Sequence, residues 1–440
     1  MSVLENGVWK VKTKSLDAGD FVEIASQKEQ IDNIAFHPNA DSVFYSGVAD
    51  GTMQIFQAIA GEAAPVQIST GNSDIFLQDV ATDGSKVLYS SVNETSDLWM
   101  IDTVDTKESV VANDVHGEYW ADFSPDGKNV AYQSVTRPDV PFHGSIVVKA
   151  LLASGAPVVV ASDGFSPIWS KDSQWIVFLR QNDAAGMSIW KVRSTGADLV
   201  KLADGGEMGY LNTPYLKTGT NHISSSSDGG ILSYSAKKDG VSNIWIVSSD
   251  GTESRPLSAN SDPGQNYCCG SWSRDGSHFA FVSQAPESQS FRLSIAEADG
   301  QNARVVFESL HLFRFLGFTL DSRELVIAQR EDVNDRSQTP AITNIHLISL
   351  SVSDKVRRVH TLTNAYSYNI HLSSDGQTIA FVSRSKDVNE LWTVPSLGGI
   401  PKKIVSEKDP KVMFSSLAWS PDGRSIIFGK QTRTNLLSML

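Results

Sequence analysis

The sequence predicts an all-β fold, a single β-propeller in which a four-stranded unit is repeated around a ring. Three observations support this prediction. A hairpin phrase recurs along the whole chain, a phrase typical of a third strand follows each copy, and the apolar residues show no helical spacing. Four short strands in about 40 to 50 residues are typical of a propeller blade.

The first two strands of each unit are predicted from the hairpin phrase, which reads "ADFSPDGKNVAYQS" at residues 121–134. Pro presets φ, Asp bonds within the turn, Gly takes a positive φ, and an alternating strand follows. The phrase returns as "GSWSRDGSHFAFVS" at 270–283 and "LAWSPDGRSIIFGK" at 417–430. Its turn aspartate marks nine copies: Asp41, Asp83, Asp126, Asp172, Asp228, Asp275, Asp321, Asp375 and Asp422.

The third and fourth strands are predicted from two shorter phrases. "SDLWMIDT" at 96–103 and "SNIWIVSS" at 242–249 represent the third strand, and "PVVVAS" at 157–162 and "KKIVSE" at 402–407 represent the fourth. We expect the tryptophans of these strands to fill the space between neighbouring blades. They are Trp9, Trp99, Trp190, Trp245 and Trp392 in third strands and Trp169, Trp272 and Trp419 in first strands.

The two ends of the chain are expected to share one blade. Residues 7–26 match a third and a fourth strand, whereas the hairpin at 417–430 has no later strand to pair with. A shared blade would close the ring and remove its open edges. The count is then nine blades, with eight as the alternative if residues 316–329 form no blade. The predicted domain is 1–440, with blades at 416–440 plus 7–28, 31–70, 76–114, 119–162, 166–204, 222–260, 269–309, 315–363 and 369–408.

The phrase "FSPDGKNVAY" followed by an "LW" strand resembles the TolB-type or WD-like propeller repeat over essentially the whole chain. The Gly-His and Trp-Asp dipeptides of WD repeats are absent, which favours the TolB type. The resemblance implies that a protein or peptide partner binds at the mouth of the central channel. Similar arrays serve as sensor modules behind bacterial kinases or winged-helix regulators, and related propellers gate peptidases or act as lyases with histidine-held metal. Fold likeness alone decides none of these functions.

Composition limits the partners and the compartment. The chain has 37 Lys and Arg against 50 Asp and Glu, a net charge of -13, which disfavours nucleic acid and anionic membrane surfaces. No run of about 18 apolar residues predicts membrane insertion, and the first residues lack the pattern of a secretion signal. The sequence as it stands predicts a cytoplasmic location. A periplasmic or other extracytoplasmic location would follow if it belongs to a longer chain.

Catalytic motifs are absent from the sequence. It has no G-x-S-x-G elbow, no phosphate-binding glycine loop and no H-E-x-x-H helix, so we predict no catalytic residue, no metal and no cofactor. A non-enzymatic binding protein is the main hypothesis, and a metal-assisted lyase or hydrolase is the alternative. The alternative needs histidines that converge on the channel, for which His116, His222 and His371 are the candidates.

The two cysteines, Cys268 and Cys269, are adjacent, which is neither a C-x-x-C pattern nor a disulfide framework. We expect two thiols at a strand edge. A disulfide between the neighbours is the alternative.

The predicted binding face carries the segments between blades and the loops between second and third strands. The longest of these are 204–222, 135–144 and 330–343. Aromatic residues with a polar tip are favoured anchors in interfaces, so we expect a protein, peptide or small ligand to bind a monomeric ring here. Little recognition is expected at the short turns of the opposite face. The candidate ligand-binding residues are His116, Glu118, Tyr119, Tyr210, Tyr215, His222, Tyr267, Tyr366 and Tyr368.

Overall fold

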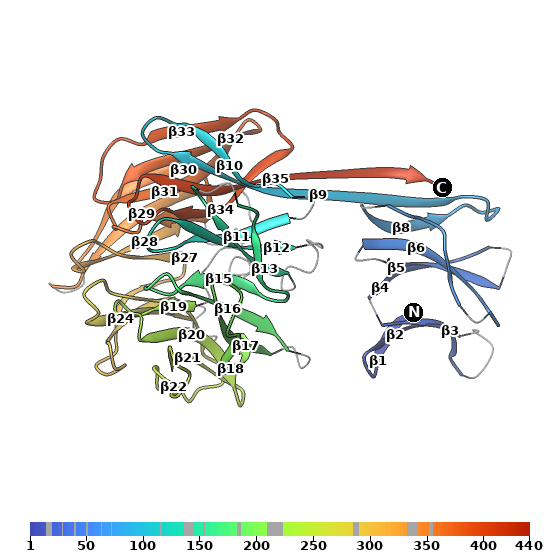
Figure 1. Ribbon diagram of the computed structural model, residues 1–440, viewed down its shortest axis with the longest axis horizontal. Coiled ribbons are helices and arrows are strands. Elements are labelled where there is room, and N and C mark those ends of the chain that lie inside the picture. Colours follow the sequence, from blue (N-terminus) through green and yellow to red (C-terminus); the bar gives the residue numbers. More distant parts are fainter. Residues whose placement is uncertain are drawn as a thin grey trace. The chain divides into compact units, whose positions relative to one another are not determined.

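In the computed structural model, the described residues form β-strands and turns, and these strands, β1 to β35, pair antiparallel to their neighbours (Figure 1). The predicted all-β fold is confirmed. Among the described residues, no helix is long and apolar enough to cross a membrane. The structure describes the whole chain except residues 15–19, 29, 39–40, 50–51, 63, 72, 115–116, 136–143, 153–154, 183–185, 209–222, 285–289, 332–340 and 352–354.

The chain divides into two compact units. The larger unit comprises residues 96–431, and the smaller comprises residues 1–95 together with 432–440. Two long strands, β9 (Val87–Asp102) and β35 (Ser425–Met439), contribute residues to both units.

The larger unit repeats a group of four antiparallel strands. Most groups follow the order of the chain, and β30 ends one group and begins the next because it pairs with both β29 and β31. The strands are β11 (Gly117–Phe123), β12 (Asn129–Val135), β13 (Ser145–Ala150), β14 (Val158–Ala161), β15 (Phe165–Trp169), β16 (Trp175–Gln181), β17 (Met187–Arg193), β18 (Val200–Met208), β19 (Ile223–Ser225), β20 (Ile231–Lys238), β21 (Val241–Ser248), β22 (Ser254–Pro256), β23 (Asn266–Trp272), β24 (His278–Gln284), β25 (Phe291–Glu297), β26 (Arg304–Ser309), β27 (Phe313–Phe318), β28 (Glu324–Arg330), β29 (Ala341–Ser349), β30 (Val356–Leu372), β31 (Thr378–Ser385), β32 (Val388–Pro395) and β33 (Lys402–Glu407).

The turn between the first and second strands uses one hydrogen-bond network throughout this unit. Ser124 Oγ donates to Asp126 Oδ1 at 2.6 Å and accepts from the Asn129 backbone N–H at 2.9 Å. Gly127 has a φ of 70°, as the phrase predicts. The same hydroxyl-to-carboxylate bond recurs in Ser170–Asp172, Ser226–Asp228, Ser273–Asp275, Thr319–Asp321, Ser373–Asp375 and Ser420–Asp422.

The C-terminal hairpin, β34 (Val412–Trp419) and β35, pairs with β9 and β10 (Glu108–Ala112) in the order β10-β9-β35-β34. Thr103 N donates to Arg424 O at 2.8 Å, and this bond matches the bond from Leu151 N to Lys128 O, 2.9 Å, in the β11–β14 group. The prediction that residues 7–26 complete this hairpin is therefore wrong. β9 and β10 lie beside the hairpin as the third and fourth strands that were predicted from residues 7–26.

Two local features explain the correction. Residues 7–26 do form a strand pair, β2 (Val8–Thr13) and β3 (Val22–Gln27), but β1 (Ser2–Glu5) pairs with the other edge of β2. β9 continues unbroken where two separate strands were predicted, since residues 91–98 contain neither Gly nor Pro.

The smaller unit contains the sheet β1–β2–β3 and a four-stranded sheet that follows chain order. The latter comprises β4 (Ile31–Phe36), β5 (Ser42–Ala49), β6 (Thr52–Ile59) and β7 (Val66–Gln67). A further strand, β8 (Asp74–Val80), pairs with the start of β9. The buried side chains of the smaller unit include Val11, Tyr45 and Leu77.

Tryptophans of first strands in the larger unit pack between neighbouring groups. Trp169 of β15 lies in a buried cluster with Ala131 and Val148 of the preceding group. Trp419 of β34 packs in the same way with Val382 and Leu391. The structural role predicted for these tryptophans is consistent with this packing.

Candidate ligand-binding channel

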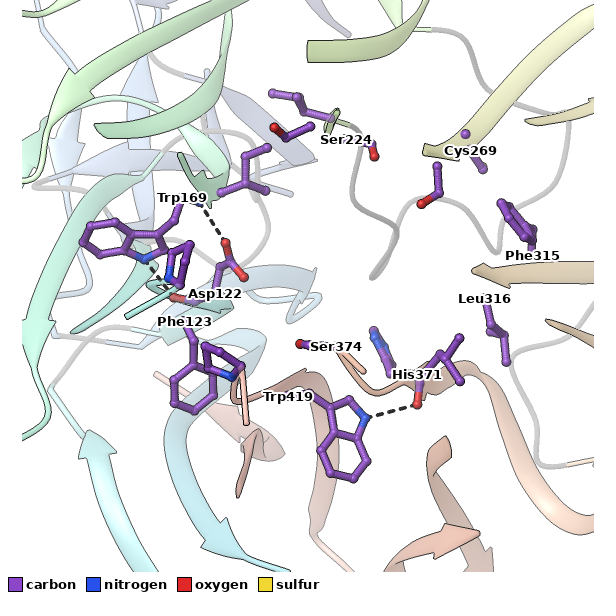
Figure 2. Close-up of a pocket in the computed structure, with 18 of the residues that line it drawn as sticks. Asp122, Phe123, Trp169, Ser224, Cys269, Phe315, Leu316, His371, Ser374 and Trp419 are labelled. Carbon is purple, nitrogen blue, oxygen red and sulfur yellow. Dashed lines mark hydrogen bonds between the residues drawn. The ribbon is translucent and has the colours of Figure 1, made fainter. Parts of the chain in front are cut away.

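A cavity of about 460 Å³ lies at the centre of the first strands of the larger unit. Its walls come from seven strands: β11, β15, β19, β23, β27, β30 and β34. Figure 2 shows Asp122 and Trp169 on one side of the space, Cys269, Phe315 and Leu316 on another, and His371, Ser374 and Trp419 on a third. We call this cavity, together with a second cavity that adjoins it, the channel.

The first strands that surround the channel contact one another in sequence. β34 contacts β11, β11 contacts β15, and β19 contacts β23. The series continues through β27 and β30 back to β34. Between β15 and β19 the contact is made by side chains, because Phe165 and Ile168 share a buried cluster with Ile223.

A β-bulge interrupts several of the first strands that surround the channel. The register shifts between Tyr119 and Asp122 in β11 and between Cys268 and Ser271 in β23. Positive φ values mark the bulges, which bend a strand and re-aim its side chains. The bulge residues are Trp120 (50°), Ser166 (52°) and Cys269 (55°), and Ser416 of β34 has a similar φ of 52°.

Asp122 and Trp169 are joined across two neighbouring groups. Trp169 N donates to Asp122 Oδ2 at 2.9 Å, and Trp169 Nε1 donates to Asp122 O at 3.1 Å. Burial raises the pKa of the Asp122 carboxyl to about 6, although the Trp169 N–H and the Lys171 ammonium oppose this rise. The carboxylate is therefore ionised at pH 7 and becomes neutral in mild acid.

Arg314 and His371 lie on the neighbouring strands β27 and β30. Burial lowers the pKa of Arg314 to about 10, so the guanidinium stays charged at pH 7. Burial, and secondarily the charge of Arg314, holds the pKa of His371 well below its usual value. His371 is therefore neutral, and its Nε2 is buried without a hydrogen-bond partner among the described residues.

A second cavity of about 310 Å³ continues the channel toward the turns of the repeated phrase. Lys171, Ser225 and Ser271 line both cavities. Arg274 lines the second, and its Nη2 donates to Ser373 O at 3.4 Å. The channel is thus lined by serine hydroxyls, three cationic side chains and one carboxylate among the described residues.

The predicted ligand-binding residues take other positions wherever the structure describes them. They were expected in segments between blades, but Glu118 and Tyr119 lie within β11, Tyr267 within β23 and Tyr366 within β30. That placement in loops is wrong, because the first strands begin several residues earlier than the hairpin phrase indicates. None of these four residues lines either cavity.

Their surroundings are those of packed side chains. Glu118 is fully buried, and burial raises its pKa to about 8, with smaller effects from the carboxylates of Asp114 and Asp97. Tyr267 stacks on Phe281 at 5.7 Å, and Tyr366 is buried. A ligand-binding role for the set remains a prediction. His116, Tyr210, Tyr215, His222 and the side chain of Tyr368 lie outside the described residues.

Sequence reasoning named His371 as a histidine that could reach the channel, but it missed Asp122, Lys171, Arg274 and Arg314. Asp122 and His371 stand two residues before the Ser of their turn phrases, and Lys171 and Arg274 stand directly after it. Aligning the repeats at that Ser would have found these positions, since equivalent positions of equivalent strands face the same space. Arg314 stands two residues before the register shift of β27, which lies between Phe315 and Gly317.

Cys268 and Cys269 form a disulfide, which corrects the expectation of two thiols. Cys268 is buried, whereas Cys269 is partly exposed and lines the channel. Within the described part of the chain, no cluster of three or more His, Cys, Asp or Glu could hold a metal ion.

Comparison with known proteins identifies the fold. No family model and no curated protein matches the sequence. An oligogalacturonate lyase in complex with manganese is similar in structure, with 12% identity, coverage of 82% of this chain and 96% of that one, and a TM-score of 0.52. The chain has a β-propeller fold.

Two further propeller structures match. For the oligogalacturonate lyase from Vibrio parahaemolyticus, identity is 12%, coverage is 81% of this chain and 97% of that one, and the TM-score is 0.50. A putative TolB from Agrobacterium tumefaciens is also among the matches, with 14% identity, coverage of 77% of this chain and 99% of that one, and a TM-score of 0.46. At these identities the likeness shows the fold alone.

Proposed function

We propose that this propeller is a binding protein without chemistry of its own, which holds a small ligand or the end of a peptide in its channel. The observation that carries the proposal is a hollow channel whose wall is contributed by every first strand of the larger unit. Ligand sites in proteins are concave spaces with a few convergent polar groups, and the channel has this character. A sensor or scaffold role in a larger assembly is compatible with such a site.

We further propose that residues 96–431 form a closed ring of seven blades, in place of nine or eight blades over the whole chain. Seven copies of the Ser/Thr–Asp turn network lie in this unit, which supports the count. The contact between β34 and β11 supports closure. The closing blade is then β34, β35, β9 and β10, with two strands from each end of the unit.

The proposed binding site is tested by filling the channel. Ser271→Trp adds an indole at a residue that lines both cavities, and Ser254→Trp adds one on the exposed outer strand β22 as the control. Thermal-shift measurements with a panel of organic acids, sugars and short peptides should yield ligands that stabilise the natural protein and the control but not Ser271→Trp. Ligands that stabilise Ser271→Trp equally well would contradict the proposal.

A metal-assisted lyase or hydrolase is the second candidate, favoured by one observation. His371 is neutral and lines the channel, and its Nε2 has no described hydrogen-bond partner, as a metal ligand would require. One of the similar propellers is an oligogalacturonate lyase in complex with manganese. A stoichiometric divalent ion that is lost in His371→Ala would support this candidate. Unchanged metal content would count against it.

A further inference from the structure

We infer that the ligand of the channel carries a carboxylate or phosphate group, which binds at the turn end of the channel beside Lys171 and Arg274. The inference rests on the proposed binding function and adds the chemical class of the ligand. It follows from the charges, the hydroxyl groups and the shape of the second cavity.

The charge of the channel is opposite in sign to that of the whole protein. The chain has a net charge of -13, yet the charged residues that line the two cavities are Lys171, Arg274, Arg314 and a single carboxylate, Asp122, among the described residues. A recess lined by one sign of charge concentrates ligands of the opposite sign. This distribution favours an anion inside the channel.

Asp122 offsets only part of this positive charge. Its Oδ2 accepts the Trp169 backbone N–H, so the carboxylate is held at the wall of the channel. His371 adds no charge at pH 7, because its pKa lies well below the usual value. The channel therefore keeps an excess of cationic groups over carboxylates at neutral pH.

The second cavity combines the two cations with hydrogen-bonding groups. Lys171 and Arg274 line it together with the hydroxyl-bearing Ser225, Ser227 and Ser271. An arginine fork, an ammonium and hydroxyl donors are the groups that bind carboxylate and phosphate oxygens in proteins. A cavity of about 310 Å³ has room for such a group and part of the molecule attached to it.

Gly317 is part of the wall of the second cavity. It stands two residues before Thr319, at the position where other blades carry Asp122 or His371. A Cβ on Gly317 would lie 3.3 Å from the Leu372 side chain, and the φ of Gly317 is 142°, a conformation that favours glycine. A larger residue here would press on Leu372, and glycine adds no polar group to the wall.

The turn aspartates favour an anion that binds inside the channel over one that binds at the outer surface of the turns. Serine hydroxyls and backbone N–H groups lower the pKa of Asp228 and Asp275, and Asp375 accepts the same kinds of hydrogen bond from Ser373 Oγ and the Gln377 N–H. None of the three lines the second cavity. Asp375 acts electrostatically on Arg274 and offsets part of its charge, so an anion is favoured on the side of Lys171, Arg274 and the serines that faces the cavity, away from the turn carboxylates.

The inference is tested with two anions and one neutral probe. Inorganic phosphate, succinate and mannitol are titrated into the full chain by calorimetry at low salt, so that phosphate and carboxylate sources are distinguished. Phosphate or succinate should bind the natural protein, and binding should weaken as salt is raised. Lys171→Met and Arg274→Gln should each weaken it about ten-fold or more, since each removes a charge-assisted contact.

Matched variants separate a specific contact from general charge. Lys128→Met removes an exposed lysine from a neighbouring turn and should bind as the natural protein does. Arg274→Lys keeps the charge and should retain most of the affinity, and thermal melting checks that each variant is folded. Binding of neither anion, binding of mannitol alone, or equal binding by Lys171→Met and Arg274→Gln would overturn the inference. If Ser271→Trp still removes ligand binding in those cases, the proposed channel function survives and only the anionic class fails.

Discussion

Lys430 joins the C-terminal hairpin to the strands that we assign to its blade. Its Nζ lies 2.7 Å from Glu108 Oε2 of β10 and 4.1 Å from the centre of the Trp99 ring of β9. The two charged side chains are 17% and 26% exposed, so solvent screens them only in part. Lys430→Met should remove both interactions and keep most of the side-chain volume.

The expected loss follows from these two contacts. A partly exposed ion pair contributes up to about 1 kcal/mol, and a cation over an indole contributes about 0.5–1 kcal/mol. Lys430→Met should therefore lower the free energy of unfolding by about 1–2 kcal/mol. In a domain of this size, this loss corresponds to a fall in Tm of about 1–3 °C.

The assay is a pair of double-mutant cycles read by urea unfolding. The cycle of Lys430→Met with Glu108→Gln should give a coupling energy of about 0.5–1 kcal/mol. The cycle with Glu23→Gln is the control, since Glu23 of β3 lies 2.8 Å from Lys10 and would face the hairpin only if residues 7–26 completed it. Coupling to Glu23 and none to Glu108 would refute the assignment of the closing blade.

Two further predictions concern buried groups. Burial holds the folded-state pKa of Glu118 at about 8, above its usual value, so the folded protein binds the extra proton and its stability falls as pH rises from about 4.5 to 8. Glu118→Gln should match the natural protein at pH 4 and exceed its unfolding free energy by at least about 1 kcal/mol at pH 8.5; parallel pH profiles would disprove the burial argument. The Cys268–Cys269 disulfide closes almost no loop of chain, so Cys268→Ser with Cys269→Ser should cost no more than about 1 kcal/mol. A loss of several kcal/mol in urea unfolding would mean that the disulfide holds the β23 bulge in place.

The sequence predicted most of the sheets because each copy of the turn phrase specifies its own hairpin. The hydroxyl of Ser124 and the carboxylate of Asp126 satisfy the turn locally, without help from distant residues. The phrase also differs between the two units: only some copies have a Ser or Thr two residues before the Asp, and the count of nine aspartates did not use this difference. The residue two positions before Asp41 is Asn39 and that before Asp83 is Ala81, so these two copies lack the hydroxyl and both fall in the smaller unit.

Strand partners at the ends were not predictable from the repeat alone. Residues 7–13 and 96–103 both match a third strand with a Trp, so the phrase cannot select between β2 and β9 as the partner of β35. Whether β2 or β9 pairs with β35 depends on long-range strand pairing and on the unbroken length of β9. A search for short strands splits β9 into two and so misses its length.

The channel residues were missed for a different reason. Loop length directed attention to Tyr210 and its neighbours, whereas Asp122 and Arg314 lie in regular strands that look structural in sequence. The bulge at Trp120 precedes Asp122 and re-aims the residues that follow it, so that the Asp122 side chain lines the channel. A bulge with a non-glycine residue at positive φ leaves no reliable mark in a single sequence.

Truncation at each end tests the central claim, that residues 96–431 form a ring closed by the C-terminal hairpin. Calorimetric unfolding is compared for the full chain, for a chain without residues 2–28 and for a chain without residues 412–440. Removing 2–28 should leave the main cooperative transition unchanged, and removing 412–440 should abolish it, because β9 and β10 lose the hairpin that completes their blade. Loss of the main transition on removal of 2–28 would contradict the account and restore the blade shared by the two termini.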